Sequence, residues 1–148
     1  MNVVVDSCFW FSLLKNRDSD YHCEAVKIYE MLNEIGVCFI IPYPSLYETI
    51  NTRLMKEGHR EKARWFFTQL MSNANFVIAS DDLYRHTAFQ NTISEQNDRG
   101  ISFVDNIIRG MLMDKASQIK ALVTFNSKDF ADLCYSNEIE LINESYAR

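Results

Sequence analysis

The feature that most constrains the fold is the alternation of short apolar runs with longer segments of helical periodicity. Strands are predicted at residues 3–5, 37–41, 76–79, 121–124 and, as a last edge strand, 140–142. The segments between them carry apolar residues at a helical spacing. Strands joined through helices pair in parallel, with right-handed crossovers that place helices on both faces of the sheet. The sequence therefore predicts an α/β fold with a mostly parallel sheet.

Cap and breaker residues give approximate helix ends. One helix is predicted from about residue 20 to residue 33, where Gly36 ends it, and Pro44 opens another. The predicted cap residues are Asp6 or Ser7, Asp81 or Asp82, and Ser102. Asp81 or Asp82 is expected to begin a long helix that runs toward Gly100.

The composition fits one domain that spans residues 1–148. Of its residues 47% are hydrophobic, with four glycines and two prolines, which suits a compact chain rich in helices. The formal net charge of −5 argues against a protein that holds duplex nucleic acid by charge alone. No apolar run approaches the roughly 20 residues that span a membrane. The first residues also lack the pattern of a signal peptide.

The four cysteines are Cys8, Cys23, Cys38 and Cys134, and none forms a C-x-x-C pair. A zinc site is therefore not expected. Buried free thiols are the simpler interpretation, and they fit a reducing compartment. Together with the absence of a signal peptide, this leads us to expect a cytoplasmic protein.

Four acidic residues fall where a parallel sheet collects its ligands. Asp6 ends the first predicted strand, and Asp129 follows the fourth. Glu48 and Asp105 lie in the first turns of predicted helices. Because ligands bind at the carboxyl ends of parallel strands, these four side chains are expected at one edge of the sheet.

Like charges gathered at one edge repel each other and raise the pKa values of the group, and a divalent cation removes that repulsion. Carboxylate oxygens favour Mg²⁺ or Mn²⁺ over zinc. Such a metal polarises a phosphoryl oxygen and activates a water, so the pattern predicts hydrolysis of phosphodiester bonds.

Each acidic residue also has a purely structural interpretation. Asp6 could cap a helix, Glu48 could lie on a solvated helix face, Asp105 could pair with Ser102 in a capping box, and Asp129 could be a surface turn residue. The four positions favour a metal site only when they are taken together.

In this order and spacing, these residues resemble the PIN-domain family over nearly the whole chain. The matching pieces are Val-Val-Val-Asp6-Ser7, Pro44-Ser-Leu-Tyr-Glu48, Ile-Ser-Phe-Val-Asp105 and Leu-Val-Thr124-Phe-Asn126-Ser-Lys-Asp129. The stretch Asp20-Tyr21-His22 is similar to the start of the family's second helix. The chain is most similar to single-domain VapC-type toxins of bacterial toxin–antitoxin pairs.

The resemblance implies a metal-dependent endoribonuclease with a three-layer α/β/α fold and about five parallel strands. It implies a homodimer and, in many members, a protein antitoxin. The implied catalytic and metal-binding residues are Asp6, Glu48, Asp105 and Asp129, with Ser7, Thr124 and Asn126 bonded to the carboxylates. Many members have an acidic residue where this chain has Asn126, so either Asn126 or Asp129 supplies the fourth position. The expected substrate is RNA in single-stranded or loop regions.

Two other phosphate-handling families fit poorly. A haloacid-dehalogenase phosphotransferase needs a second Asp where this chain has Cys8. A response-regulator receiver needs an acidic pair after its first strand and an Asp after its third, where this chain has Ser80. The alternative that stays open is a catalytically weak PIN-like module that binds RNA or a partner protein, because Asn126 carries no charge.

Two further predictions concern surfaces. The densest basic stretch contains Arg53, Lys56, His59, Arg60, Lys62 and Arg64. Arg53, Lys56, Arg60 and Arg64 could contact RNA phosphates, or the stretch could be a solvated helix face. Trp65 is expected to point away from a helix face formed by Ala63, Phe66, Phe67 and Leu70. Trp65 could then anchor a protein interface, or pack under the helix that ends near Glu57.

Overall fold

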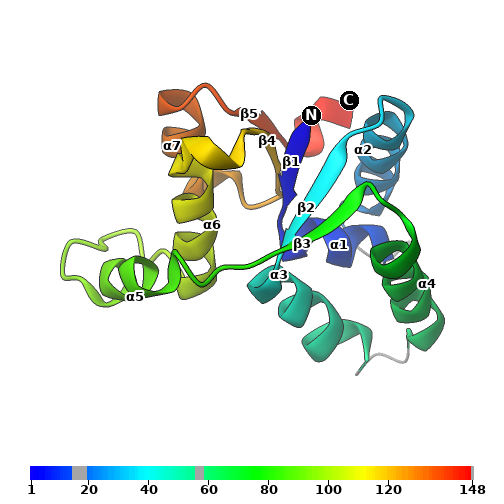
Figure 1. Ribbon diagram of the computed structural model, residues 1–148, viewed down its shortest axis with the longest axis horizontal. Coiled ribbons are helices and arrows are strands. Elements are labelled where there is room, and N and C mark those ends of the chain that lie inside the picture. Colours follow the sequence, from blue (N-terminus) through cyan, green and yellow to red (C-terminus); the bar gives the residue numbers. More distant parts are fainter. Residues whose placement is uncertain (15–19, 56–58, 148) are drawn as a thin grey trace.

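The computed structural model describes residues 1–14, 20–55 and 59–147, and for residues 51–53 it describes the backbone alone. Its centre is one sheet of five parallel strands in the order β3-β2-β1-β4-β5 (Figure 1). The strands are β1 (Asn2–Val5), β2 (Cys38–Pro42), β3 (Phe76–Ala79), β4 (Ile119–Val123) and β5 (Glu140–Ile142). The predicted α/β class, with about five parallel strands and β5 at an edge, is confirmed.

Helical segments connect every two consecutive strands. The helices are α1 (Ser7–Leu14), α2 (His22–Glu34), α3 (Tyr43–Glu48), α4 (Arg60–Ser72), α5 (Arg85–Ile93), α6 (Phe103–Met113) and α7 (Ala131–Ser136). A π-helical segment, Thr49–Leu54, continues α3, and short 3₁₀ turns cover Lys115–Ser117, Ser127–Asp129 and Glu144–Ala147. None of the described helices combines the length and apolar character that crossing a bilayer requires.

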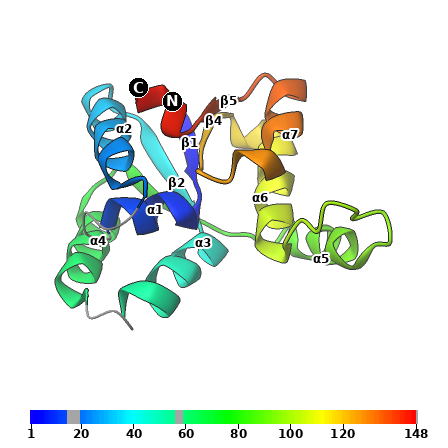
Figure 2. The ribbon, with the colours of Figure 1, turned by 180° about the vertical axis from the view of Figure 1, so that it is seen from behind.

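Helices cover both faces of the sheet, which makes three layers. In Figures 1 and 2, α1, α2 and α4 lie on one side of the strands, and α5, α6 and α7 lie on the other. Val3 and Val5 of β1 belong to the core under α1, α2 and α4, whereas Val4 belongs to the core under α6 and α7. All three valines are fully buried, and each such burial stabilises the fold by roughly 1.5–3 kcal/mol. A central strand covered on both faces explains why its sequence is an unbroken apolar run.

The strand order places a topological switch point between β1 and β4. From β1 the chain builds outward through β2 and β3, and it then crosses over to add β4 on the other side of β1. Connections leave the two central strands toward opposite faces there, so the carboxyl ends of β1 and β4 border a natural ligand crevice. Asp6 directly follows β1, and Thr124 directly follows β4.

The helix after β3 is shorter than the sequence suggests. The prediction of a long helix capped by Asp81 or Asp82 is wrong, because α5 covers only Arg85–Ile93 and has no side-chain cap. The Asp81 carboxylate instead accepts two hydrogen bonds from the Arg85 guanidinium, each 2.7 Å long. Asp81 is therefore occupied by an ion pair and does not cap the helix.

The buried face of α4 is narrower than predicted. Phe66 is fully buried, but Phe67 is 57% exposed, so its assignment to the buried face is wrong. At about 100° per residue, Phe67 and Trp65 lie on either side of the stripe centred on Phe66. Trp65 is 38% exposed and packs edge-on against Tyr29 of α2, with ring centroids 6.0 Å apart. Glu57, the alternative neighbour for Trp65, lies outside the described residues.

Candidate active site

Asp6 is the buried centre of the candidate site. It is 4% exposed and lies at the switch point, immediately after β1. Thr124 Oγ1 donates a 2.8 Å hydrogen bond to Asp6 Oδ2, and the Ser7 backbone N–H donates a 2.6 Å hydrogen bond to Oδ1. These donors come from both central strand ends, so the fold itself fixes the orientation of this carboxylate.

Ser7 joins Asp6 to Glu48. Its hydroxyl donates a 2.6 Å hydrogen bond to Glu48 Oε2, and it lies 3.4 Å from Asp6 Oδ1. Glu48 is the last residue of α3, just before the π-helical segment, so the bond ties α3 to the start of α1. Burial raises the pKa of Glu48; the bond from Ser7 opposes this shift, and the charge of Asp6 adds to it.

Asp105 comes to the same region from α6 on the opposite face of the sheet. Ser102 caps this helix: its Oγ accepts a bond from the Asp105 backbone N–H at 3.1 Å and donates one to Asp105 Oδ2 at 2.7 Å. The capping interpretation of Asp105 is therefore correct as local structure. It does not conflict with a place in the site, because the cap holds the carboxylate in the first turn of α6.

Burial and the charges of the other three carboxylates raise the pKa of Asp105. Burial raises this pKa to about 6, the hydrogen bond from Ser102 opposes the shift, and the charges of Asp6, Asp129 and Glu48 raise it further. Charges shift a pKa in this way only over short distances. Hydrogen bonds through Ser7, Thr124 and Asn126 connect Asp6 with Glu48 and Asp129, and the effect of these charges places Asp105 in the same region.

Asp129 and Asn126 form the fourth part of the candidate site, after Asp6, Glu48 and Asp105. Asn126 Nδ2 donates a 2.6 Å hydrogen bond to Asp129 Oδ2, and the Asn126 backbone N–H donates a 2.9 Å bond to Thr124 Oγ1. The Asn126 side chain therefore directs its amide group at Asp129. Of these two residues, Asp129 is the one whose charge acts on Asp105.

Cys8 is a member of the site to which the sequence analysis gave no role. Its Sγ donates to Asp6 Oδ2 at 3.0 Å, lies 3.3 Å from Thr124 Oγ1 and accepts a bond from the Phe125 backbone N–H at 3.2 Å. Burial, followed by the charge of Asp6, raises the pKa of the Cys8 thiol, so the sulfur keeps its proton. The sequence feature that could have identified Cys8 as part of the site is its position two residues after Asp6.

The cysteines as a group differ from the prediction of buried thiols. All four are free, but only Cys134 is buried. Cys23 is exposed, and Cys8 and Cys38 are half-buried. The exposure of Cys23 follows from its place on the outer side of the first turn of α2.

Two of the predicted basic residues, Arg60 and Arg64, lie on an element that carries none of the four carboxylates. Arg60 and Arg64 are exposed on the first two turns of α4, and no contact described for this chain joins either of them to the carboxylates. The Arg53 side chain and Lys56 lie outside the described part of the chain. Figure 1 shows that α4 begins at the same end of the molecule as the carboxyl ends of the strands.

The donor set of the site suits a hard divalent cation. It offers carboxylate oxygens from Asp6, Glu48, Asp105 and Asp129, the ligand type that Mg²⁺ and Mn²⁺ prefer. Within residues 1–14, 20–55 and 59–147, no three histidine, cysteine or acidic side chains are already grouped around one point as ligands. The site fits such a cation through its donor chemistry, with Asp6, Glu48 and Asp129 connected by hydrogen bonds through Ser7, Thr124 and Asn126.

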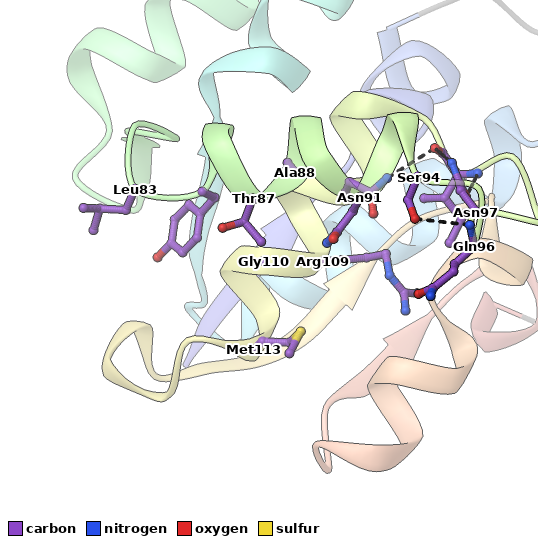
Figure 3. Close-up of a pocket in the computed structure, with 13 residues that line it drawn as sticks. Leu83, Thr87, Ala88, Asn91, Ser94, Gln96, Asn97, Arg109, Gly110 and Met113 are labelled. Carbon is purple, nitrogen blue, oxygen red and sulfur yellow. Dashed lines mark hydrogen bonds between the residues drawn. The ribbon is translucent and has the colours of Figure 1, made fainter.

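A separate cavity of about 510 Å³ lies between α5, the loop after it and α6. Its lining includes Tyr84, Asn91, Gln96, Asn97, Arg109 and Gly110 (Figure 3). None of the four carboxylates lines it. Arg109, at its border, is the residue that connects α6 to the turn holding Asp129, through a 2.6 Å hydrogen bond to the Asp129 backbone carbonyl.

Comparison of the sequence with known protein families gives no match, and comparison with curated proteins gives none. The case for a function therefore depends on the geometry and the chemistry of the carboxylate site.

Proposed function

We propose that this chain is a metal-dependent endoribonuclease that hydrolyses RNA phosphodiester bonds with Mg²⁺ or Mn²⁺. One observation carries the proposal: Asp6 is buried at the switch point, and hydrogen bonds through Ser7 and Thr124 connect it to Glu48 and to the Asn126–Asp129 pair. Four acidic groups at the switch point of a parallel sheet have no evident purpose in stability, since like charges repel. They form a suitable ligand set for a cation that handles phosphate.

The site residues have two roles: some would bind the cation, and others orient the carboxylates that bind it. Asp6, Glu48 and Asp105 would hold the cation, with Asp129 as the fourth charged group. Thr124 and Ser7 keep the oxygens of Asp6 and Glu48 oriented through their hydroxyl donors. When bound, the metal polarises a phosphoryl oxygen and lowers the pKa of a water. The sequence resemblance to PIN domains is what supports RNA as substrate, and single-stranded or loop regions are expected because bases there are open to side chains.

The test is cleavage of a labelled single-stranded RNA by the purified chain in Mg²⁺ or Mn²⁺, and in excess EDTA. Cleavage should require metal, and Asp6→Asn or Asp105→Asn should abolish it because each removes a charge with little change in volume. Glu30→Gln, an exposed carboxylate on α2, is the matched control and should leave cleavage unchanged. Robust cleavage in EDTA would overturn the mechanism, and full activity of both aspartate variants would overturn the site.

A second candidate is a catalytically weak module that binds RNA or a partner protein. The observation that favours it is Asn126, a neutral side chain whose amide group donates to Asp129 and offers no charge of its own to a cation. RNA binding without metal-dependent cleavage by the wild type would favour this candidate.

The partners belong to the proposal as well. We propose a cytoplasmic homodimer that acts as the toxin of a toxin–antitoxin pair and is restrained by a protein antitoxin. The support is the sequence resemblance together with the half-exposed Trp65 on α4. A small reading frame upstream whose product binds the chain and stops cleavage would be the expected finding.

A further inference from the structure

Arg109 connects α6 to α7 and to the turn before it. Its Nη1 donates to Asp132 Oδ1 at 2.9 Å and its Nη2 to Asp132 Oδ2 at 3.0 Å, a two-pronged ion pair. Nη1 also donates to the Asp129 backbone carbonyl at 2.6 Å. The Arg109 side chain is only 18% exposed, and its bond holds the pKa of Asp132 well below the ordinary range. Paired hydrogen bonds to a planar guanidinium are both strong and directional.

Asp129, whose backbone carbonyl accepts the bond from Arg109, is one of the four acidic residues of the carboxylate site. Asp129 ends a 3₁₀ turn of three residues, Ser127–Asp129. Its backbone carbonyl is held by Arg109 and, more weakly at 3.4 Å, by Arg99, while its carboxylate accepts the bond from Asn126. Such a short turn has little rigidity of its own, so these contacts fix where Asp129 lies.

Arg109 also stands on the helix that carries Asp105. The two residues are four positions apart in α6, so they lie on neighbouring turns of the same helix face. A single rigid helix therefore presents one carboxylate directly and fixes another through its arginine. The Arg109 contact therefore links the helix of Asp105 to the backbone of Asp129.

We propose that Arg109, fixed by Asp132, is a positioning residue that sets the distance between Asp105 and Asp129 and thereby the affinity of the site for a divalent cation. The inference rests on the proposed function, because it requires that the site bind metal. Arg109 itself is not a ligand, and its effect passes through Asp129.

The experiment is a calorimetric titration of the full chain with Mn²⁺, which measures binding without catalysis. Arg109→Gln should weaken Mn²⁺ binding about tenfold, the lower end of the loss found when a residue supporting a metal ligand is removed. Asp132→Asn should weaken it in the same direction, and it provides a second variant if Arg109→Gln fails to fold. Arg85→Gln is the matched control, since it breaks a similar two-pronged pair, Arg85–Asp81, and should leave Mn²⁺ binding unchanged.

The decisive comparison measures the effect of Arg109→Gln on Mn²⁺ affinity in a chain that already carries Asp129→Asn. If Arg109 acts through Asp129, adding Arg109→Gln to Asp129→Asn should produce less than a twofold further loss of Mn²⁺ affinity. An equal loss in both backgrounds, or wild-type affinity in folded Arg109→Gln and Asp132→Asn, would overturn the inference while leaving the metal site intact. A wild type that binds no Mn²⁺ and cleaves no RNA would overturn the proposed function and the inference with it.

Discussion

Thr124 Oγ1 donates a 2.8 Å hydrogen bond to Asp6 Oδ2, and so joins the residue after β4 to the residue after β1. Both side chains are buried, so the bond is shielded from water and constrains the central carboxylate. Its importance can be tested without changing the shape of the site, because valine has nearly the same volume as threonine.

Thr124→Val should lower RNA cleavage by about 10–100-fold, the effect expected when a hydrogen bond to a metal ligand is removed. It should also cost about 1–3 kcal/mol of unfolding free energy, because a buried acceptor loses its donor. Cleavage rates and urea unfolding would measure the two effects. Thr124→Ser keeps the donor and serves as the control. Because Thr124→Val retains the methyl group, wild-type cleavage and stability in that variant would contradict a role for the hydroxyl donor.

Asp105 should make the metal-free protein less stable as the pH rises from about 4 to about 6. An aspartate in the unfolded chain titrates at about 3.9, whereas burial raises the pKa of Asp105 to about 6 in the folded protein. Between these values the folded state binds more protons than the unfolded state, so its stability falls with rising pH. Asp105→Asn should therefore raise the melting temperature in EDTA at pH 7.5, with little gain at pH 4.

The control for Asp105 is Glu30→Gln, which removes an exposed carboxylate from α2. Its melting temperature should follow the wild-type pH profile. A gain for Asp105→Asn of the same size at both pH values would contradict the assignment of a raised pKa to this residue.

The basic face of α4 is tested by salt. If Arg60 and Arg64 contact RNA phosphates, Arg60→Ala with Arg64→Ala should weaken RNA binding and flatten its salt dependence, by about 0.7 in logarithmic slope per lost contact to a single strand. The matched control is Lys115→Ala with Lys120→Ala, which removes the same charge from exposed positions near the start of β4. Identical slopes for the two double variants would assign α4 to the solvated surface.

Trp65 is tested by association. The wild type should form a dimer at micromolar concentration in sedimentation experiments, and Trp65→Ala should shift it toward monomer, because large half-exposed aromatics are typical interface anchors. Tyr135→Ala, at a side chain that is 90% exposed on α7, is the control and should leave the dimer intact. A strictly monomeric wild type would contradict the proposed homodimer. The role of Trp65 would then be to pack against Tyr29 within its own chain.

The sheet could be predicted because its signals are local. A strand that is buried on both faces is a short unbroken apolar run, so residues 3–5 were recognisable from the sequence. Residues 76–79 form an edge strand with Val77 exposed, and they were recognisable as an apolar run alone. The place of Asp6 in the site could be predicted from the strand at residues 3–5, since ligands bind at the carboxyl ends of parallel strands. Asp105 was recognisable for a similar reason, because Ser102 marks the start of its helix.

What the sequence could not predict depends on contacts between distant segments. The Arg109–Asp132 pair joins two helices that are separated by β4, and no periodicity announces it. The capacity of Asp81 to pair with Arg85 likewise competes with capping, and only the folded geometry decides between them. The exposure of Phe67 depends on how much of α4 the sheet covers, which residue hydrophobicity does not specify.

The pairing of β1 with β4 has a consequence for the time at which the proposed nuclease site can form during synthesis. Asn2 pairs with Ile119, so the central strand is made first but waits for more than 100 further residues before its second neighbour exists. Contacts between such distant segments form slowly, because a long loop must close before they stabilise anything. The chain on the ribosome therefore has no Thr124 to hold Asp6 until residues 119–124 have emerged. A nuclease built in this way would stay inactive toward nearby RNA through most of its own translation.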